Sequence, residues 1–445
     1  MDKEQLKKEA LEYHSDGTPG KIALKMTKPL TNQHHLSLAY TPGVAEPCKL
    51  IAENKEDVYK YTAKGNSVAV VSDGTAVLGL GDIGPSAGIP VMEGKGVLFK
   101  GFGGVDAFPL CLDDVRNEKG RTDPDKIVET VKRIAPCFGG INLEDIGAPA
   151  CFEIEERLIK ELDIPVFHDD QHGTAIITFA ALLNAVEMTG KKMEDLKVVF
   201  NGAGAAGIAC AKLYISAGIK KENMLMCDSK GVIYKGRTEG MNPQKEFFAA
   251  DTEKRTLADA MKGADLFCGV SVAGCLKKEM VSSMNEKSII FAMANPVPEI
   301  MPEEAYEAGG YVVGTGRSDF PNQVNNVLGF PGIFRGALDV GATAINDEMK
   351  IGAAQALAGL AKEPVPQAVK DAYKADADAG ILDGDNPINS KYVIPKPIDA
   401  RVVPRVARYV AEAAMKSGVA KKPIDDLDSY EQEVTARIKK QNEEN

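Results

Sequence analysis

Short apolar runs alternate with glycine turns and helix-like stretches through the middle of the chain. The clearest unit extends from Lys197 to Asp228. It opens with the apolar run 198–200, passes through a glycine-rich turn into a helix-like stretch, and ends in a second apolar run at 224–227. An apolar run before such a turn is typical of a buried parallel strand. The pattern predicts a strand, a helix and a second strand in one continuous unit.

The turn in this unit has the spacing of a dinucleotide-binding site. Gly202, Gly204 and Gly207 form G-x-G-x-x-G, with Ala205 and Ala206 between the second and third glycines. We expect the first glycine to permit a tight turn and the second to let a pyrophosphate approach the backbone. The third would let the helix pack closely on the strand. Glycines alone could form a mere turn, but a strand before and a helix after them favour nucleotide binding.

The same alternation continues toward the carboxyl end. Apolar runs at 265–270, 288–293 and 311–314 predict further strands, and residues 402–416 and 430–440 predict helices. We therefore expect an α/β fold with a doubly wound, Rossmann-type dinucleotide domain and an α/β amino-terminal domain for substrate and catalysis. A helical carboxyl-terminal extension completes it. The expected boundaries are residues 1–160, 161–380 and 381–445.

The amino-terminal part is rich in glycine. A strand, a tight turn and a second strand are predicted at 67–71 and 76–80, before the glycine-dense stretch 79–113. Because this stretch is too apolar for a flexible linker, we expect its backbone to approach a small ligand. Lys95, flanked by glycines, is a candidate base because burial in a cleft lowers the pKa of a lysine. The alternative is a surface lysine in a loop, with Lys100 as its local competitor.

Polar side chains also stand at predicted turns and strand ends. Tyr40 precedes a Thr-Pro-Gly turn, which would hold its phenol at the end of an extended segment, although a core tyrosine is the simpler interpretation. Asn295 follows a predicted strand, and Asn325 and Asn326 precede a predicted helix. Such amides could hydrogen-bond a carboxylate or a nicotinamide, or could serve only as turn residues.

Two acidic pairs follow predicted strands. Glu144 and Asp145 form the first, and Asp169 and Asp170 the second. The carboxyl ends of parallel strands form the ligand crevice of an open α/β sheet, so the pairs could converge on one divalent cation. Oxygen ligands favour Mg²⁺ or Mn²⁺, while the two histidines beside the second pair could support the loop. Either pair taken alone could equally be solvated or cap a helix.

Charge and cysteine content limit the classes of function. The 445-residue chain has a net charge of -11, which argues against nucleic acid or an anionic membrane as the main partner. We see neither a targeting peptide nor an apolar run long enough to span a membrane. The 8 cysteines include no C-x-x-C pair, so we expect reduced thiols and no zinc ribbon. These features predict a cytoplasmic enzyme that acts on a small molecule.

The chemistry-bearing segments together resemble malic enzymes, in the shorter form typical of bacteria and some protists. The resemblance extends from about residue 15 to beyond residue 400. Its order and number of motifs are far more specific than the glycine triplet. The motifs are AYTPGVAEPC with Tyr40, GLGDIG, GIPVMEGK ending at Lys95, NLED with Glu144 and Asp145, HDDQHGTA with Asp169 and Asp170, NGAGAAG, ANPVPE with Asn295, and NNVLGFPG with Asn325.

The resemblance implies oxidative decarboxylation of L-malate to pyruvate and CO₂, with reduction of NAD or NADP and a need for Mg²⁺ or Mn²⁺. By similarity, Lys95 would be the base and Tyr40 the acid that protonates C3. Asn295 and one of the two adjacent asparagines would hold the substrate carboxylate. The implied metal ligands are Glu144, Asp145 and Asp170, with Asp169 beside them shaping charge and hydrogen bonding.

Two departures from the family pattern leave questions open. Larger animal-type enzymes carry an arginine where this chain has Ala76, and Arg317 is our candidate substitute for binding the substrate carboxylate. Asp228 should favour a free ribose hydroxyl and therefore NAD. Cations that follow it, including Lys230 and Arg237, could instead accept the 2′-phosphate of NADP.

Three alternatives to a malic enzyme are a malolactic enzyme that retains its cofactor and releases lactate, another two-domain NAD(P) dehydrogenase, and a nucleotide-sensing regulatory module. Only the first of these would need both acidic pairs. We also expect a homodimer or a dimer-based oligomer, with the carboxyl-terminal helices packed on the amino-terminal part or on a second subunit.

Overall fold

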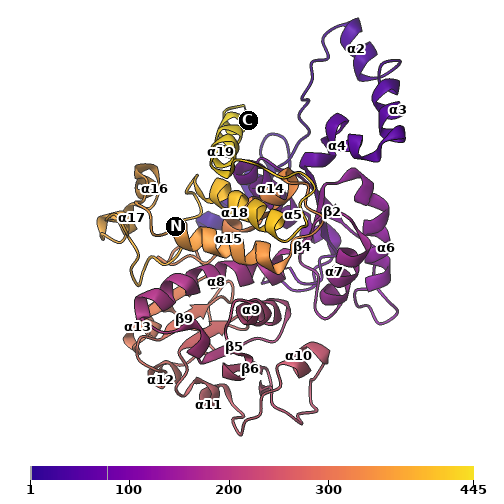
Figure 1. The fold of residues 1–445 in the computed structure, drawn as a ribbon. Helices are drawn as coiled ribbons and strands as arrows, with labels where there is room; N and C mark the ends of the chain where they lie inside the picture. The colour runs from indigo at the N-terminus through magenta and orange to yellow at the C-terminus, as the bar shows by residue number, and fades with distance from the viewer. Residues whose placement is uncertain (1–2, 78, 445) are drawn as a thin grey trace.

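The computed structural model describes residues 3–77 and 79–444 and contains two sheets covered by helices (Figure 1). Four parallel strands form the first sheet in the order β2-β1-β3-β4. The second has the order β10-β9-β8-β5-β6-β7, with only the short β7 antiparallel to its neighbour. The strands are β1 (Ser67–Ser72), β2 (Asp106–Cys111), β3 (Gly140–Leu143), β4 (Val166–His168), β5 (Val198–Asn201), β6 (Met224–Asp228), β7 (Gly231–Val232), β8 (Leu266–Gly269), β9 (Ile289–Ala292) and β10 (Val312–Thr315).

Helices cover both sheets, and the expected α/β class with a Rossmann-type domain is confirmed. The helices are α1 (Lys3–Ser15), α2 (Gln33–Ala39), α3 (Ala45–Glu53), α4 (Val58–Tyr61), α5 (Pro85–Gly103), α6 (Pro124–Ile134), α7 (Ala150–Glu161), α8 (Asp169–Thr189), α9 (Ala205–Ser216), α10 (Pro243–Phe247), α11 (Leu257–Met261), α12 (Lys278–Ser282), α13 (Pro302–Glu307), α14 (Phe330–Asp339), α15 (Asp347–Leu360), α16 (Gln367–Ala372), α17 (Lys374–Asp378), α18 (Val402–Lys416) and α19 (Leu427–Glu443).

The first sheet is buried on both faces because successive side chains of a strand point to opposite sides. In β1, Ala69 and Val71 pack with α6 and α7, whereas Val68 and Val70 join the large core that includes α5, α8 and α14. Although we assigned residue 161 onward to the nucleotide domain, β4 pairs with β3 in this first sheet. The three domain boundaries remain predictions.

The second sheet is likewise covered on both sides. Val198 and Phe200 of β5 face α8 and α9 within the large core, and Val199 faces a separate apolar cluster with α11 and α12. The helices α14, α15 and α18 pack against one another, and α19 packs on α18 and α5. The expected helix 402–416 is α18 with the same bounds, and the expected helix 430–440 lies inside α19.

One expectation for the glycine-rich part is wrong. No second strand forms at 76–80 among the described residues, because positive φ angles at Gly79 and Gly81 turn the chain there; Leu78 lies outside the described residues. The stretch 85–103 is the helix α5. Its glycines permit close packing, since a β-carbon at Gly96 would lie 3.3 Å from a carbonyl oxygen of β2, and one at Gly103 would lie 3.0 Å from one in α14.

Residues 22–53, which we call the arm, contrast with this packed body. The arm contains α2 and α3, which project away from the sheets in Figure 1. None of its residues is buried. Its exposed apolar side chains are Ile22, Leu24, Met26, Leu30, Leu36, Leu38, Tyr40, Val44 and Leu50.

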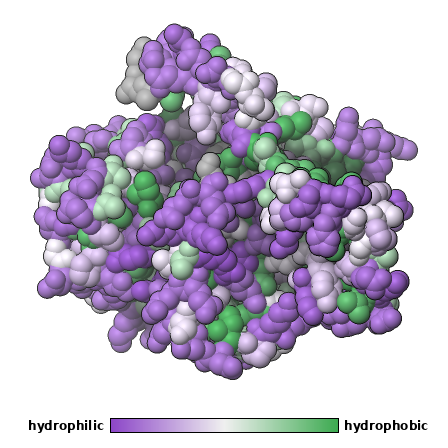
Figure 2. Space-filling view, turned by 90° about the horizontal axis from the view of Figure 1, so that it is seen from above, coloured by the Kyte–Doolittle hydropathy of each residue, from purple (hydrophilic) through white to green (hydrophobic). Residues whose placement is uncertain are grey.

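Figure 2 shows hydrophilic residues over much of one face, interrupted by apolar patches. Within the described ranges, the helices lack the length and apolarity that a membrane span requires.

Candidate active site

A cavity of about 1080 Å³ lies where the carboxyl ends of strands from both sheets meet. Its lining includes Glu144 after β3, Asp169 after β4, Val270 after β8 and Met293 after β9. The carboxyl edge of a parallel sheet is the usual position of a ligand crevice in α/β proteins. The two sheets therefore contribute to one shared cavity.

Three of the predicted acids converge in this cavity. Ligand oxygens of Glu144, Asp145 and Asp170 all lie within 4.8 Å of one another. The backbone N–H of Asp145 donates to Asp170 Oδ2 over 2.8 Å, which ties the first pair to the second. Asp145 has a φ of 53°, an uncommon value for a residue other than glycine. Such local strain is concentrated at functional sites in proteins.

The electrostatics of these acids fit a divalent cation. Burial, followed by repulsion from Asp170 and other neighbouring carboxylates, raises the pKa of Asp145 to about 7. Burial also raises the pKa of Glu144, although Lys95 opposes the shift. The buried Oδ2 of Asp145 has no hydrogen-bond partner among the described residues. Because a cation would relieve both the repulsion and the unmet acceptor, this set of oxygens could hold Mg²⁺ or Mn²⁺.

Lys95 lies at the same place but in a different state from the one predicted. It is in the middle of α5, with Nζ 2.7 Å from Asp169 Oδ2 and 3.0 Å from Glu144 Oε1. Burial alone would lower its pKa, but the charges and hydrogen bonds of Asp169 and Glu144 raise it instead. In this arrangement Lys95 is an ammonium group, and the expectation of a pKa near neutral is wrong. The sequence could not show that two acids would contact it.

Asp169 accepts hydrogen bonds from two other residues of the cavity and is not a free carboxylate. It is fully buried, and its Oδ2 accepts from Lys95 and from Asn326 Nδ2, the latter over 3.0 Å. A β-carbon at Gly173 would lie 2.2 Å from Asp169 Oδ1, so glycine is required there. We call the four carboxylates of Glu144, Asp145, Asp169 and Asp170 the acid centre. Asn326 contacts this centre directly, and Asn325 lines the same cavity and accepts a hydrogen bond from the Val327 N–H.

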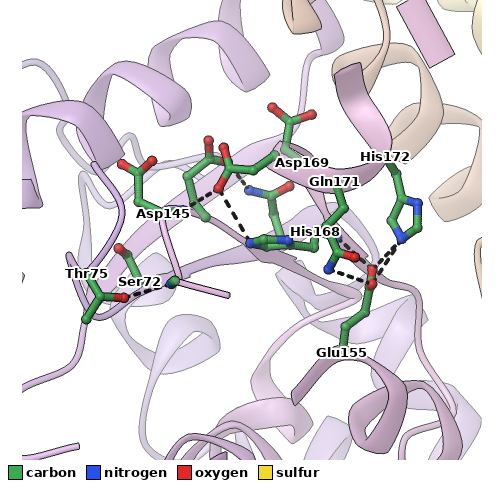
Figure 3. A network of polar contacts seen from close by, with 12 residues as sticks. Ser72, Thr75, Asp145, Glu155, His168, Asp169, Gln171 and His172 are labelled. Atoms are coloured by element: carbon green, nitrogen blue, oxygen red, sulfur yellow. Dashed lines mark hydrogen bonds and ion pairs between the residues drawn. The ribbon is translucent and has the colours of Figure 1, made fainter. Parts of the chain in front are cut away.

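A buried glutamate that the sequence analysis missed supports the second acidic pair (Figure 3). Glu155 of α7 accepts from the backbone N–H of His168 (3.0 Å) and from Gln171 Nε2 (3.1 Å), and lies 2.9 Å from His172 Nε2. Burial opposes its ionisation, but the charge and hydrogen bond of His172 lower its pKa to about 2. His168 Nε2 in turn lies 3.5 Å from Asp170. The histidines thus support the junction of β4 and α8.

The glycine turn has the geometry that its spacing predicts. Gly202 has a φ of 118°, and α9 begins directly after Gly204. A β-carbon at Gly207 would lie 1.8 Å from Gly202 O, whereas one at Gly204 would meet nothing within 4 Å. Ala205 and Ala206 line the cavity at the start of α9. The open backbone at a helix N-terminus fits a dinucleotide pyrophosphate.

Asp228, at the end of β6, is held by two cations. Arg237 Nη2 donates to both carboxylate oxygens, at 2.8 and 2.7 Å, and Lys245 Nζ donates over 2.7 Å. Burial opposes ionisation, but the hydrogen bonds from Lys245 and Arg237 keep the pKa of Asp228 below its ordinary value. We noted Arg237 in the sequence and missed Lys245, whose only signal was its place after the Asn-Pro start of a short helix.

Asn295, Ala76 and three residues of the amino-terminal segment also line the cavity. Asn295 lines the cavity after β9, as its position predicts, and Ala76 lines it without offering a charge. The sequence analysis missed Tyr13, His14 and Lys21, which line the cavity as well. Nothing in their local sequence indicates that this segment would return to the site.

Two predicted residues are not brought to the site. Tyr40 is 70% exposed in the arm and does not line the cavity. Arg317 is paired with Asp319 over 2.6 Å and also lies outside the lining, although the neighbouring Gly316 is part of it. The roles given to Tyr40 and Arg317 remain predictions.

The sequence and the fold resemble those of known proteins. Family models for the N-terminal domain and the NAD binding domain of malic enzyme match residues 19–159 and 171–370. The bifunctional malic/malolactic enzyme of Bacillus subtilis (strain 168) is 58% identical over 424 residues, 94% of this chain and 96% of that protein. The malic enzyme of Pyrococcus horikoshii Ot3, known from a crystal structure, has a TM-score of 0.87 and 43% identity, covering 99% of this chain and 100% of that one.

Some relatives are much longer. An NADP-dependent malic enzyme of Rhizobium meliloti (strain 1021) is 55% identical over 431 residues, which are 96% of this chain but 54% of the relative. This chain therefore spans about half the length of that protein.

The paired sheets, the glycine turn and the acid-lined cavity define an α/β protein of the dinucleotide-binding class. Within that class, the chain belongs to the malic enzyme family.

Proposed function

We propose that this chain catalyses the oxidative decarboxylation of L-malate to pyruvate and CO₂, with reduction of a nicotinamide cofactor. The observation that carries the proposal is the convergence of three carboxylates within 4.8 Å, beside a lysine and in the same cavity as a dinucleotide turn. Family membership supports the same reaction. The names of both curated relatives described above include a malic enzyme activity.

The residues of the chain divide the work. Glu144, Asp145 and Asp170 would hold Mg²⁺ or Mn²⁺, and a cation bound there would supply Lewis-acid stabilisation for the charge that develops on the substrate C2 oxygen. Lys95 would take the proton of the C2 hydroxyl as hydride leaves C2 for the nicotinamide. For this it must first release its own proton to solvent, and binding of a cation at Glu144 would weaken the attraction that holds that proton. Asp169 would orient Lys95 through their hydrogen bond.

Tyr40 would supply the proton that C3 receives after CO₂ leaves, and we propose that it does so in the cavity of a partner subunit. The arm that carries it has no buried residue and presents several exposed apolar side chains. Exposed apolar patches mark interaction sites. In a homodimer with two-fold symmetry, each arm would reach across to the other subunit.

For the cofactor, we propose a preference for NADP over NAD. A free carboxylate at Asp228 would repel a 2′-phosphate, but the ion pairs with Arg237 and Lys245 leave a net positive charge at that point. The name of the Rhizobium meliloti relative specifies NADP.

A turnover assay with L-malate, Mn²⁺ and each cofactor tests the proposal. We expect NADPH and pyruvate in equal amounts, and slower turnover with NAD. The second candidate, a malolactic reaction, is favoured by the name of the Bacillus subtilis relative and would yield lactate without free reduced cofactor. No consumption of malate under any of these conditions would contradict the proposed function.

A further inference from the structure

The cavity has an unequal distribution of charge. Four carboxylates line it, those of Glu144, Asp145, Asp169 and Asp170. Among the described lining residues, the cationic side chains are those of Lys95 and Lys21. A dicarboxylate substrate brings two negative charges. A cation bound by the carboxylates of the cavity can pair with one of the two substrate carboxylates. The other carboxylate needs a cation from the protein, because burying an unpaired charge is costly.

Lys95 is poorly suited to this task. Its ammonium already contacts Asp169 and Glu144, at 2.7 and 3.0 Å, and rests 4.3 Å from the centre of the Phe330 ring. The proposed reaction also requires it to exchange a proton. The amides of Asn295 and Asn325 line the cavity and can donate hydrogen bonds to a carboxylate, but they carry no charge. Because Lys95 is committed to two acids and to proton transfer, the distal carboxylate still lacks a charged partner.

Lys21 is not committed in this way. Its Nζ donates to Pro90 O over 2.6 Å and lies 2.9 Å from His14 Nε2. Within the described residues, its ammonium forms no ion pair with a carboxylate at hydrogen-bond distance; Glu93 instead accepts from the Lys21 backbone N–H over 3.1 Å. A lysine held by two neutral groups keeps its full charge for a ligand.

Lys21 lies against α5, which places its ammonium group near the helix turn that carries Lys95. A β-carbon at Gly94 would lie 3.5 Å from Lys21 Nζ, so the ammonium rests against the turn of α5 that carries Lys95. Burial lowers the pKa of Lys21, with the charge of Glu93 acting in the opposite direction. Partial burial also strengthens any ion pair that Lys21 makes with a ligand.

The other positions considered for this role offer less. Ala76 lines the cavity but has no charge. Arg317 lies outside the lining, with its guanidinium bound to both oxygens of Asp319 at 2.8 and 2.6 Å. To bind substrate, Arg317 would have to leave that carboxylate.

We propose that Lys21, fixed by His14 and the Pro90 carbonyl, is the cation that binds the second carboxylate of the substrate and so selects dicarboxylic over monocarboxylic 2-hydroxy acids. This inference rests on the proposed function for the location of the substrate. It assigns Lys21 to binding and specificity, with no part in the proton transfers.

The test measures binding of L-malate and of L-lactate, which lacks the second carboxylate, by titration calorimetry with Mn²⁺ and NADPH present. This mixture does not allow malate oxidation. For Lys21→Ala we expect malate binding to weaken about 10- to 100-fold, the range for loss of a charge-assisted hydrogen bond, while lactate binding changes less than about twofold. Lys21→Arg should retain malate binding within about fivefold, because it keeps the cation.

Lys25→Ala is the matched control, since Lys25 lies four residues further on, does not line the cavity and pairs with Glu444. It should bind malate like the unaltered chain. Unchanged malate binding in Lys21→Ala overturns the inference, as does an equal loss for malate and lactate or no malate binding by the unaltered chain. If malate binds through Lys21 but is not oxidised in the turnover assay, the proposed function fails and the inference stands.

Discussion

The acid centre and the arm carry residues proposed for the same reaction, yet they differ in almost every physical respect. Around Lys95 and Asp169, side chains are buried, ion-paired and fixed by packing between two sheets. Around Tyr40, no residue of the arm is buried, and apolar side chains face solvent. A buried, hydrogen-bonded group keeps its geometry before substrate arrives, whereas an exposed segment must acquire its position from something else.

This difference suggests a division between the two halves of the reaction. The residues proposed for cation binding and for the oxidation step are pre-organised in one chain. The proposed proton donor for the last step would become organised when a second chain covers the arm. The predictions that follow separate these halves, in order of decreasing effect.

The largest effect should come from the buried half. Lys95→Ala removes the proposed base and leaves two buried carboxylates unpaired, so we expect malate oxidation and pyruvate reduction to fall together by about 10³- to 10⁴-fold. Steady-state rates in both directions measure this. Lys100→Ala is the control from the same helix, because that lysine pairs with Asp106 away from the cavity. Retention of either activity by Lys95→Ala would contradict the assigned role.

The arm should affect only one step. For Tyr40→Phe we expect pyruvate formation to fall by about 10²- to 10³-fold, because a general acid is lost, while reduction of oxaloacetate changes much less. Rates of the two reactions, measured on the same preparation, provide the comparison. Tyr61→Phe, in α4 and also exposed, should behave like the unaltered chain. An equal loss in both reactions would remove the distinction between the two halves.

Pre-organisation of the acid centre should reduce stability in the absence of metal. The pKa of Asp145 is raised from 3.8 to about 7, so the folded chain holds that proton more tightly than the unfolded chain does. The contribution of protonated Asp145 to the free energy of unfolding is therefore complete below about pH 4 and is lost as pH rises through about 7. Asp145→Asn should therefore gain stability relative to the unaltered chain between pH 4.5 and pH 8, by on the order of 1 to 4 kcal/mol.

Denaturant unfolding with a chelator, at both pH values, measures that difference. With saturating Mn²⁺ at pH 8, the unaltered chain should instead be more stable than Asp145→Asn, because it binds the cation more tightly than the variant does. A stability difference that does not depend on pH would show that Asp145 ionises normally.

The smallest effect concerns the cofactor. Lys245→Gln removes one of the two cations at Asp228, so we expect kcat/KM with NADP to fall by about 10-fold and that with NAD to change less than about twofold. Arg237 remains and keeps part of the charge. Lys254→Gln is a control from the same domain outside the cavity. An equal loss with both cofactors would indicate a structural role for Lys245.

Sequence patterns were sufficient for features that depend on local spacing, on helical periodicity or on a position at a strand end. The glycine turn and α18 follow from local spacing and periodicity, and the convergence of both acidic pairs follows from their positions after parallel strands. The helix α5 was missed because its glycines hide the helical period, and their function depends on how closely β2 and α14 approach.

Contacts between distant segments could not be predicted in this way. Three examples are the contacts of Lys95 with two acids, the ion pair of Lys245 with Asp228, and the position of Lys21 in the cavity lining. Each brings together positions that share no local sequence pattern. The raised pKa of Lys95 follows from such contacts, which is why flanking glycines suggested the opposite direction. The arm was unpredictable for a related reason, since exposure depends on what the rest of the chain leaves uncovered.

The division between a pre-organised half and a partner-supplied half is tested most directly by mixing two inactive variants, Tyr40→Phe and Lys95→Ala, under conditions that allow subunits to exchange. If Tyr40 acts across the dimer, each mixed dimer contains one site with an intact Lys95 and an intact tyrosine from its partner. Malate-dependent pyruvate formation should then recover to about a quarter of that of the unaltered chain. If the mixture remains as inactive as its components after exchange is verified, Tyr40 does not act in the partner's cavity and the account is contradicted.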